Sequence, residues 1–285
     1  MAGASWSFDK ASEHLEEFCG LKISDNTIRN LCQKEAVPMG RWQRTAPTAN
    51  AEFIAAQGEV EFTTDGTCVN TVDGWREMRV AIFAKRNPGE CVHADQWDKR
   101  KLPKPHVSVA MAAIENKETF RRHWGVRARQ LQVENETISV LADGAHWIWD
   151  AAMLEFDKRD EVLDVYHALE KISDCGKVLY GTETKEFATW QDETKWELLW
   201  NGFELIEKRL DKLDAELRLD LEQPAESRSK SQTKLDAEKE AIRILRGYLS
   251  NHAKRLNYRQ RLANGKSIGS GQIEGACKKT SSAGG

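Results

Sequence analysis

The stretch "TISVLADGAHWIWD" at residues 137–150 limits the fold of this chain more than any other part of the sequence. Its first half is a nearly continuous apolar run that ends at Asp143-Gly144. A short run of this kind suits a strand buried on both faces in the middle of a sheet. A strand buried in this way needs layers above and below it, so we expect an α/β fold.

Three stretches before this run alternate apolar and polar residues, a pattern typical of strands. They are "GEVEFTTDG" at 58–66, "REMRVAIFA" at 76–84 and "HVSVAMAAI" at 106–114. The first strand is expected to break at Asp65-Gly66. Asp73-Gly74 is expected to form the hairpin turn before the second strand.

The remaining elements extend this set of strands. A polar helix is expected at about 117–131, between the third strand and the buried one, and "EVLDVYH" at 161–167 is expected to be a fifth strand. Three antiparallel strands extended by parallel ones through a helical crossover predict a mixed sheet with helices on its faces. This is the strand order of the ribonuclease H-like fold.

The segment before the sheet is expected to be helical at 10–36. "ASEHLEEFCG" places Leu15 and Phe18 on one side, and "SDNTIRNLCQKEA" opens with the capping residue Ser24 and turns Ile28 and Leu31 inward. Two short helices across a glycine turn predict either a helix-turn-helix that binds DNA or a plain helical hairpin. The exposed residues of the DNA-binding version are Arg29, Asn30 and Lys34. Residues 38–57 are expected to be a linker.

The segment 186–257 has a different pattern. Apolar residues recur at heptad spacing in two runs, which are Leu199, Phe203, Ile206, Leu210, Leu213 and Leu217, then Leu235, Ile242, Leu245, Leu249 and Leu256. The first run predicts one long helix, and a polar loop with a proline separates it from the second. We expect the two helices to form an antiparallel pair, which by itself carries no chemistry.

Composition narrows the class of protein. Hydrophobic residues make up 40% and charged residues 31% of the chain, which is the balance of a folded protein rather than a disordered one. The net charge of −3 does not indicate nucleic-acid binding, although a basic face can still exist on part of the surface. The six cysteines form no C-x-x-C pair, so neither a zinc ribbon nor a redox motif is expected. No membrane-length apolar run and no signal peptide are visible, so we expect a cytoplasmic protein.

The stretch "NGKSIGSGQIEGACKK" at 264–279 sets Glu274 behind a glycine-rich turn. A P-loop is excluded because Gln260 stands where its first glycine is required. A dinucleotide fingerprint is excluded because Glu274 occupies its third glycine position. The glutamate therefore needs another explanation, either as a first-turn carboxylate of a helix or as a ligand.

Three carboxylates fit a metal site. Asp65 and Asp143 are each expected at a strand end, and if those strands are neighbours both side chains lie at one edge of the sheet. A last helix starting near Gly271 can return Glu274 to that edge. Three clustered carboxylates repel one another unless a cation lies among them, and hard oxygen ligands favour Mg²⁺ or Mn²⁺. Taken singly, each Asp-Gly is also a common turn dipeptide, and Asp73-Gly74 is a third copy.

The sequence resembles the DDE transposases of bacterial insertion sequences, in the Mutator-like branch with an α-helical insertion. The matching pieces are "FTTDGT", "VLADGAHWIWD", "VLDVYHALEKI" and "IGSGQIEGACK", between about 58 and 280. The resemblance implies that Asp65, Asp143 and Glu274 are the catalytic triad and bind two Mg²⁺ or Mn²⁺ ions. It also implies a D-x-x-H element at Asp164–His167, with His167 near the DNA or the metals. The alternative for His167 is a core histidine.

The residue patterns and the resemblance together predict a division of the chain into four parts. They are a helix-turn-helix-like DNA-binding segment at 1–50, the first part of a ribonuclease H-like core at 58–185, the α-helical insertion at 186–257, and the final core helix with Glu274 at 258–285. The resemblance implies that the chain acts in the bacterial nucleoid on the terminal repeats of the element and on target DNA. A homodimer is expected, joined through the heptad helices.

Basic and aromatic residues are expected to hold the DNA. The basic candidates are Arg121, Arg122, Arg127, Arg129, Lys254, Arg255, Arg259, Arg261, Lys278 and Lys279. Trp147 is expected either to stack on an exposed base or to pack in the core. Three functions stay open: a transposase, a truncated and inactive DNA-binding derivative that competes with or represses it, and a ribonuclease H-like nuclease without strand transfer. The second arises because only eleven residues, 285 minus 274, follow Glu274.

Overall fold

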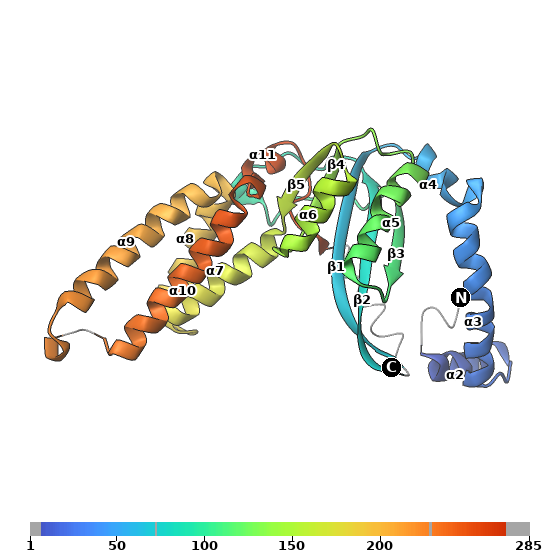
Figure 1. Cartoon of the computed structure of the whole chain (residues 1–285), viewed down its shortest axis with the longest axis horizontal. Helices are drawn as coiled ribbons and strands as arrows, with labels where there is room; N and C mark the ends of the chain where they lie inside the picture. Colours follow the sequence, from blue (N-terminus) through green and yellow to red (C-terminus); the bar gives the residue numbers. More distant parts are fainter. Residues whose placement is uncertain (1–6, 72, 228–229, 272–285) are drawn as a thin grey trace.

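The computed structural model describes residues 7–271 except 72 and 228–229. Its centre is a five-stranded mixed sheet in the order β3-β2-β1-β4-β5. The strands are β1 (Glu59–Thr71), β2 (Gly74–Arg86), β3 (Val107–Ala113), β4 (Ile138–Ala142) and β5 (Arg159–Leu163). The first three pair antiparallel, whereas β4 runs parallel to β1 and β5 parallel to β4. The mixed sheet expected from the sequence is therefore present (Figure 1).

The described residues also form ten α-helices. They are α2 (Phe8–Cys19), α3 (Asp25–Thr45), α4 (Ala51–Ala55), α5 (Lys117–Gln130), α6 (His146–Glu155), α7 (Val165–Tyr180), α8 (Lys185–Asn201), α9 (Phe203–Glu222), α10 (Gln232–Asn251) and α11 (Tyr258–Ala263). Short 3-10 turns lie at Pro47–Asn50, Ala94–Gln96, Ala225–Ser227 and Ala253–Arg255. None of these helices is long and apolar enough to cross a membrane.

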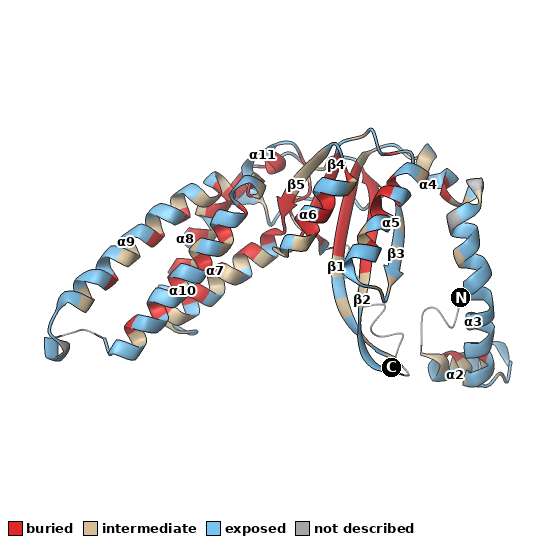
Figure 2. Ribbon diagram, in the orientation of Figure 1, coloured by how far each residue is buried: buried red, intermediate tan, exposed pale blue. Residues whose placement is uncertain are grey.

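The main core lies between the sheet and helices α5 and α6. The Phe62 ring of β1 is 4.8 Å from the rings of both Phe83 and Trp124, and 5.0 Å from that of Phe156. All five residues of β4 are buried, as expected of a central strand. Figure 2 shows the buried residues concentrated in the sheet and along the inner sides of the helices.

The expected break in the first strand is wrong. Strand β1 continues past Asp65-Gly66 and stays paired with β2 as far as Thr71, opposite Gly74. The hairpin turn forms at Asp73-Gly74, as expected, and Gly74 there has a φ of 95°. The two copies have the same turn chemistry, so only the pairing of the strands decides between them.

The N-terminal helical segment also differs in part from expectation. Helix α3 continues through Pro38 to Thr45, so helix replaces much of the expected linker. Ser24 caps α3 as expected, accepting a hydrogen bond from the Thr27 N–H at 3.2 Å, and Ile28 is buried. The predicted inward position of Leu31 is wrong, because this side chain is 51% exposed.

The helical segment forms a layer of its own beside the sheet (Figure 1), in which α9 and α10 run antiparallel as expected. The expected single long helix is wrong, because it divides at Gly202. This residue ends α8 and precedes α9 with a φ of 63° and a ψ of −129°, a conformation open to glycine. Leu199 therefore belongs to α8, while Ile206 and Leu210 of α9 are buried in the core.

The fifth strand, expected at 161–167, ends earlier than predicted. Strand β5 stops at Leu163, and α7 begins at Val165. Asp164 lies between them as the N-cap of α7, so its side-chain oxygen satisfies backbone N–H groups of the first helical turn. The change from strand to helix thus falls on the aspartate of the D-x-x-H element.

Candidate functional site

Asp65 lies within β1 and Asp143 directly follows β4, at the same end of the stretch over which these neighbouring strands pair in parallel. The paired stretch of β1 and β4 ends where Thr63 lies opposite Leu141. Each aspartate follows two residues later, 65 minus 63 and 143 minus 141, so the two hold equivalent positions past the last pair. Because neighbouring strands are about 4.8 Å apart, this register brings both half-buried residues to one edge of the sheet.

Helix α10 packs against the turn that follows β4. Asp143 Oδ1 accepts the Ala145 N–H at 2.9 Å, which makes the turn compact. A Cβ atom added to Gly144 would lie 2.4 Å from the Tyr248 ring, so the close approach of α10 requires glycine there. Burial raises the pKa of Tyr248, and the Asp143 and Asp164 carboxylates raise it further. Tyr248 is therefore a neutral neighbour of both aspartates at physiological pH.

His252 lies one helical turn after Tyr248 and is 1% exposed. Burial, the Arg255 guanidinium and His146 lower the pKa of His252 to about 4. The imidazole is thus neutral at pH 7, and its Nδ1 lies 3.2 Å from Arg255 Nη1. Since a guanidinium only donates, Nδ1 is the acceptor in this contact. The helical layer therefore supports the Asp143 turn with neutral, aromatic side chains.

Asp164 ties the glycine-rich turn to the same edge of the sheet. Its side chain is fully buried, and Oδ1 accepts the Tyr166 N–H at 2.7 Å and the His167 N–H at 3.4 Å. Oδ2 accepts both the backbone N–H and the hydroxyl of Ser270. The Val165 N–H also donates to the Ile268 carbonyl at 3.0 Å. Residues 268–270 therefore lie at the carboxyl ends of β4 and β5, a few positions before Glu274.

A second buried polar cluster fixes the segment that leads from α11 into the glycine-rich turn. Arg261, which is 2% exposed, donates from Nε to the Ser267 carbonyl at 2.7 Å and also pairs with Asp160. The Ser267 hydroxyl donates to Glu61, and Arg86 Nε donates to the other Glu61 oxygen at 3.0 Å. Burial lowers the pKa of Arg261. Because this guanidinium is buried with protein partners, Arg261 is unsuited to the phosphate contact expected of it.

The predicted metal triad is only partly within the described residues. Asp65 and Asp143 come together, whereas Glu274 lies outside the described residues. Within 7–271, leaving out 72 and 228–229, no cluster of three His, Cys, Asp or Glu side chains is arranged to hold a metal ion. Carboxylate oxygens are the ligands that Mg²⁺ prefers. The chemistry of Asp65 and Asp143 therefore suits two of the ligands of a divalent cation site.

The predicted DNA-binding residues differ in their surroundings. Arg122 and Lys254 are exposed, and His167 is partly exposed beside Glu170, with 3.6 Å between Nδ1 and Oε2. Arg121 forms an ion pair with Glu155 at 2.5 Å. Lys278 and Lys279 lie outside the part of the chain that is described. Exposed cations are available to a phosphate backbone, whereas a paired one must first leave its partner.

Two further DNA-binding candidates are engaged in packing. The Trp147 ring lies 5.8 Å from that of Trp124, which favours its alternative as a core residue. Arg255 pairs with Glu161 at 2.7 Å and lies 4.4 Å above the Trp149 ring. Both residues are therefore held by the protein itself.

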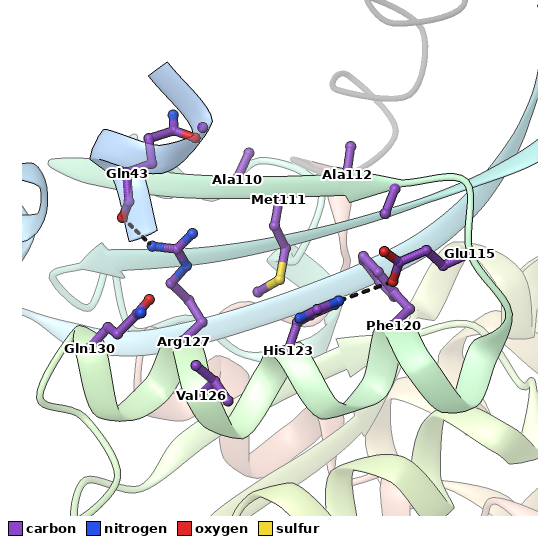
Figure 3. Close-up of a pocket in the computed structure, with 12 residues that line it drawn as sticks. Gln43, Ala110, Met111, Ala112, Glu115, Phe120, His123, Val126, Arg127 and Gln130 are labelled. Carbon is purple, nitrogen blue, oxygen red and sulfur yellow. Dashed lines mark hydrogen bonds and ion pairs between the residues drawn. The ribbon is translucent and has the colours of Figure 1, made fainter. Parts of the chain in front are cut away.

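A cavity of about 300 Å³ lies apart from this edge, between α3, β3 and α5. Figure 3 shows His123 facing Glu115, with 3.0 Å between Nε2 and Oε2, and Arg127 reaching the Gln43 carbonyl at 3.2 Å. Met111 and Val126 supply its apolar lining. The ionisable groups seen here contact one another or the backbone.

Sequence reasoning missed three contributors to the candidate site. Tyr248 and His252 belong to a helix that was expected to carry no chemistry, and nothing in the local pattern ties them to Asp143. Ser270 was treated only as part of a turn. The N-cap position of Asp164 could have been found, because Asp before a helical apolar pattern is a capping signature.

Searched against known proteins, the sequence matches no protein-family model and no curated protein.

Proposed function

We propose that this chain is a DDE transposase with a ribonuclease H-like catalytic core, which cuts and joins the DNA ends of an insertion sequence. The observation that carries the proposal is the parallel pairing of β1 with β4, which brings Asp65 and Asp143 to one edge of the sheet. The strand order β3-β2-β1-β4-β5, with three antiparallel strands followed by two parallel ones, supports the ribonuclease H-like assignment.

The position of the glycine-rich turn supports Glu274 as the third carboxylate. Asp164 holds Ser270 at the carboxyl ends of β4 and β5. Glu274 is three positions after Gly271, and three residues span at most about 11 Å of extended chain. The proposal therefore requires only that the few residues after Ser270 bring Glu274 to Asp65 and Asp143.

In this proposal the three carboxylates hold two Mg²⁺ ions, which supply the Lewis acidity that activates a water or a 3′-hydroxyl and stabilises the leaving oxygen. The protein contributes the orientation of Asp65 and Asp143 through the strand register. Tyr248 and His252 limit the access of water to the Asp143 turn and add no charge there. Exposed cations such as Arg122 and Lys254 bind the phosphate backbone.

The test is a cleavage assay with a duplex that carries the sequences flanking the gene. The substitutions Asp65→Asn, Asp143→Asn and Glu274→Gln keep side-chain size and remove the charge. Each is expected to lower Mg²⁺-dependent strand cleavage by at least about 100-fold, because the site loses a metal ligand, and to leave duplex binding close to that of the unchanged protein.

Asp73→Asn is the matched control, because it alters the third Asp-Gly copy, which forms the hairpin turn at the far end of β1 and β2. This control is expected to cleave normally. Equal loss of cleavage in Asp73→Asn and Asp143→Asn, or full cleavage in all three site variants, would overturn the proposal.

A further inference from the structure

A cavity beside the glycine-rich turn combines cations with aromatic rings. Its volume is about 470 Å³, and it is bounded by segment 97–105, the start of α7 and residues 268–271. We call it the Arg100 cavity, after the half-buried arginine among its lining residues. Its charged and aromatic lining consists of Arg86, Arg100, Lys104, Asp98, Trp97 and Tyr166.

The Arg100 cavity carries an excess of positive charge. Arg86 is neutralised by Glu61 at 3.0 Å, and Asp98 is the only carboxylate among the lining residues. Arg100 donates from Nη1 to the neutral carbonyl of Lys266 at 2.7 Å, and no carboxylate of the described residues forms an ion pair with it. Burial lowers the pKa of Arg100, which indicates that its charge is poorly solvated. A half-buried guanidinium without a carboxylate partner in the described part of the chain is stabilised when an anion enters.

The aromatic side favours a flat ligand group. Tyr166 is 56% exposed, and its ring centroid lies 6.0 Å from that of Trp97 at an angle of 54°. Exposed aromatic faces beside cations are the chemistry that binds unpaired bases and their phosphates. Bases within a duplex are already stacked on one another, so these rings can act only on a base that is out of the stack.

The Arg100 cavity adjoins the candidate catalytic edge. Tyr166 is two residues after Asp164, whose carboxylate holds Ser270, and Gly269 packs against the Tyr166 ring. We propose that the Arg100 cavity binds one unpaired nucleotide of a single DNA strand, with its phosphate at Arg100 and Lys104 and its base on Tyr166. The proposal rests on the proposed function for its role, which is to hold the strand next to the phosphodiester that is cut.

Binding of a dye-labelled oligothymidylate, measured by fluorescence anisotropy with the full chain over a range of salt concentrations, tests the proposal. Arg100→Gln and Lys104→Gln are each expected to weaken binding and to reduce the salt slope, d log K/d log [salt], by roughly 0.7, the value for one contact to a single strand. Tyr166→Ala is expected to weaken binding by about 5- to 100-fold with the salt slope unchanged.

Two control variants match these changes. Lys212→Gln removes an exposed cation on α9, and Trp75→Ala removes an aromatic ring that is 72% exposed at the hairpin. Both are expected to bind as the unchanged protein does. Lys104 is an exposed lining residue, so its variant tests the cavity with little effect on folding.

Three outcomes would overturn the assignment. They are no binding of the oligothymidylate by the unchanged protein, binding of a duplex as tightly as the single strand, and equal losses in the cavity and control variants. Asp143→Asn is included to separate the two proposals. If it binds normally and cleavage is absent even in the unchanged protein, the transposase proposal fails while the nucleotide site stands.

Discussion

Gly144→Ala is the substitution whose effect follows most directly from the geometry. The new Cβ would lie 2.4 Å from Tyr248 Cε2, 2.7 Å from Oη and 2.8 Å from Cζ. Carbon atoms in contact are normally about 3.5 Å apart or more, so the nearest pair must separate by about 1.1 Å, 3.5 minus 2.4. The Tyr248 ring cannot simply swing away, because His252 packs against it with centroids 5.1 Å apart.

We expect Gly144→Ala to lower the free energy of unfolding by about 1–3 kcal/mol, the usual cost of overpacking. For a chain of this size, a loss of about 2 kcal/mol corresponds to a fall in Tm of roughly 4–8 °C. The measurement is urea unfolding followed by circular dichroism, supported by thermal melts. If the Asp143 carboxylate moves by about 1 Å with its turn, cleavage is expected to fall by about 100-fold.

A double-mutant cycle with Tyr248→Ala tests the cause. Removing the ring leaves space for the added methyl group, so the double variant is expected to be more stable than the sum of the single effects by at least about 1 kcal/mol. Additive effects, within about 0.5 kcal/mol, would show that Tyr248 is not what excludes a side chain at position 144. The reasoning about the Asp143 turn and α10 would then be refuted.

Two further predictions concern the helical layer. The pKa of His252 in the folded protein, about 4, lies below its unfolded value of about 6.5. The neutral His252 therefore contributes fully to the free energy of unfolding above pH 6.5, and this contribution is lost as the pH falls towards 4, by at most about 3 kcal/mol. His252→Gln is expected to flatten the curve of unfolding free energy against pH between 4 and 6.5. The control variant His93→Gln is expected to leave the curve unchanged. Gly176→Ala would place a Cβ 2.3 Å from Trp190 Cδ1 and is expected to destabilise by about 1–3 kcal/mol. Gly247→Ala, with open space around it, is expected to stabilise by about 0.5–1 kcal/mol, and the same sign for both glycine variants would contradict the packing.

The sheet could be predicted from the sequence because its pattern is local. Alternation in three stretches and a continuous apolar run identify strands without knowledge of their partners. The ends of strands and helices are less predictable, because two sites with the same local turn chemistry can each end an element. Asp65-Gly66 and Asp73-Gly74 have the same turn chemistry, yet only the second forms the hairpin, since that choice pairs the whole length of β1 with β2.

The helices show the same limit in a different form. A heptad stripe runs unbroken across Gly202 in the sequence, because the apolar spacing is the same on both sides of it. The left-handed φ of this glycine ends α8 and redirects the chain into α9. Pro38 shows the reverse case. Its position in the sequence predicts the end of a helix, whereas in the structure it lies inside α3. A proline removes one backbone hydrogen bond, and the rest of α3 tolerates that loss.

The candidate site depends most on contacts that no local pattern contains. Asp164 and Ser270 are 106 positions apart, and Glu61 and Ser267 are 206 apart. A buried carboxylate is stable only when its oxygens accept hydrogen bonds, so the full burial of Asp164 requires both the first turn of α7 and the Ser270 turn. Loss of either partner leaves a buried acceptor unsatisfied. The same physical requirement that caps α7 therefore fixes the glycine-rich turn at the carboxyl ends of the parallel strands, and this coupling explains why Ser267 and Ser270 of a short polar turn are buried.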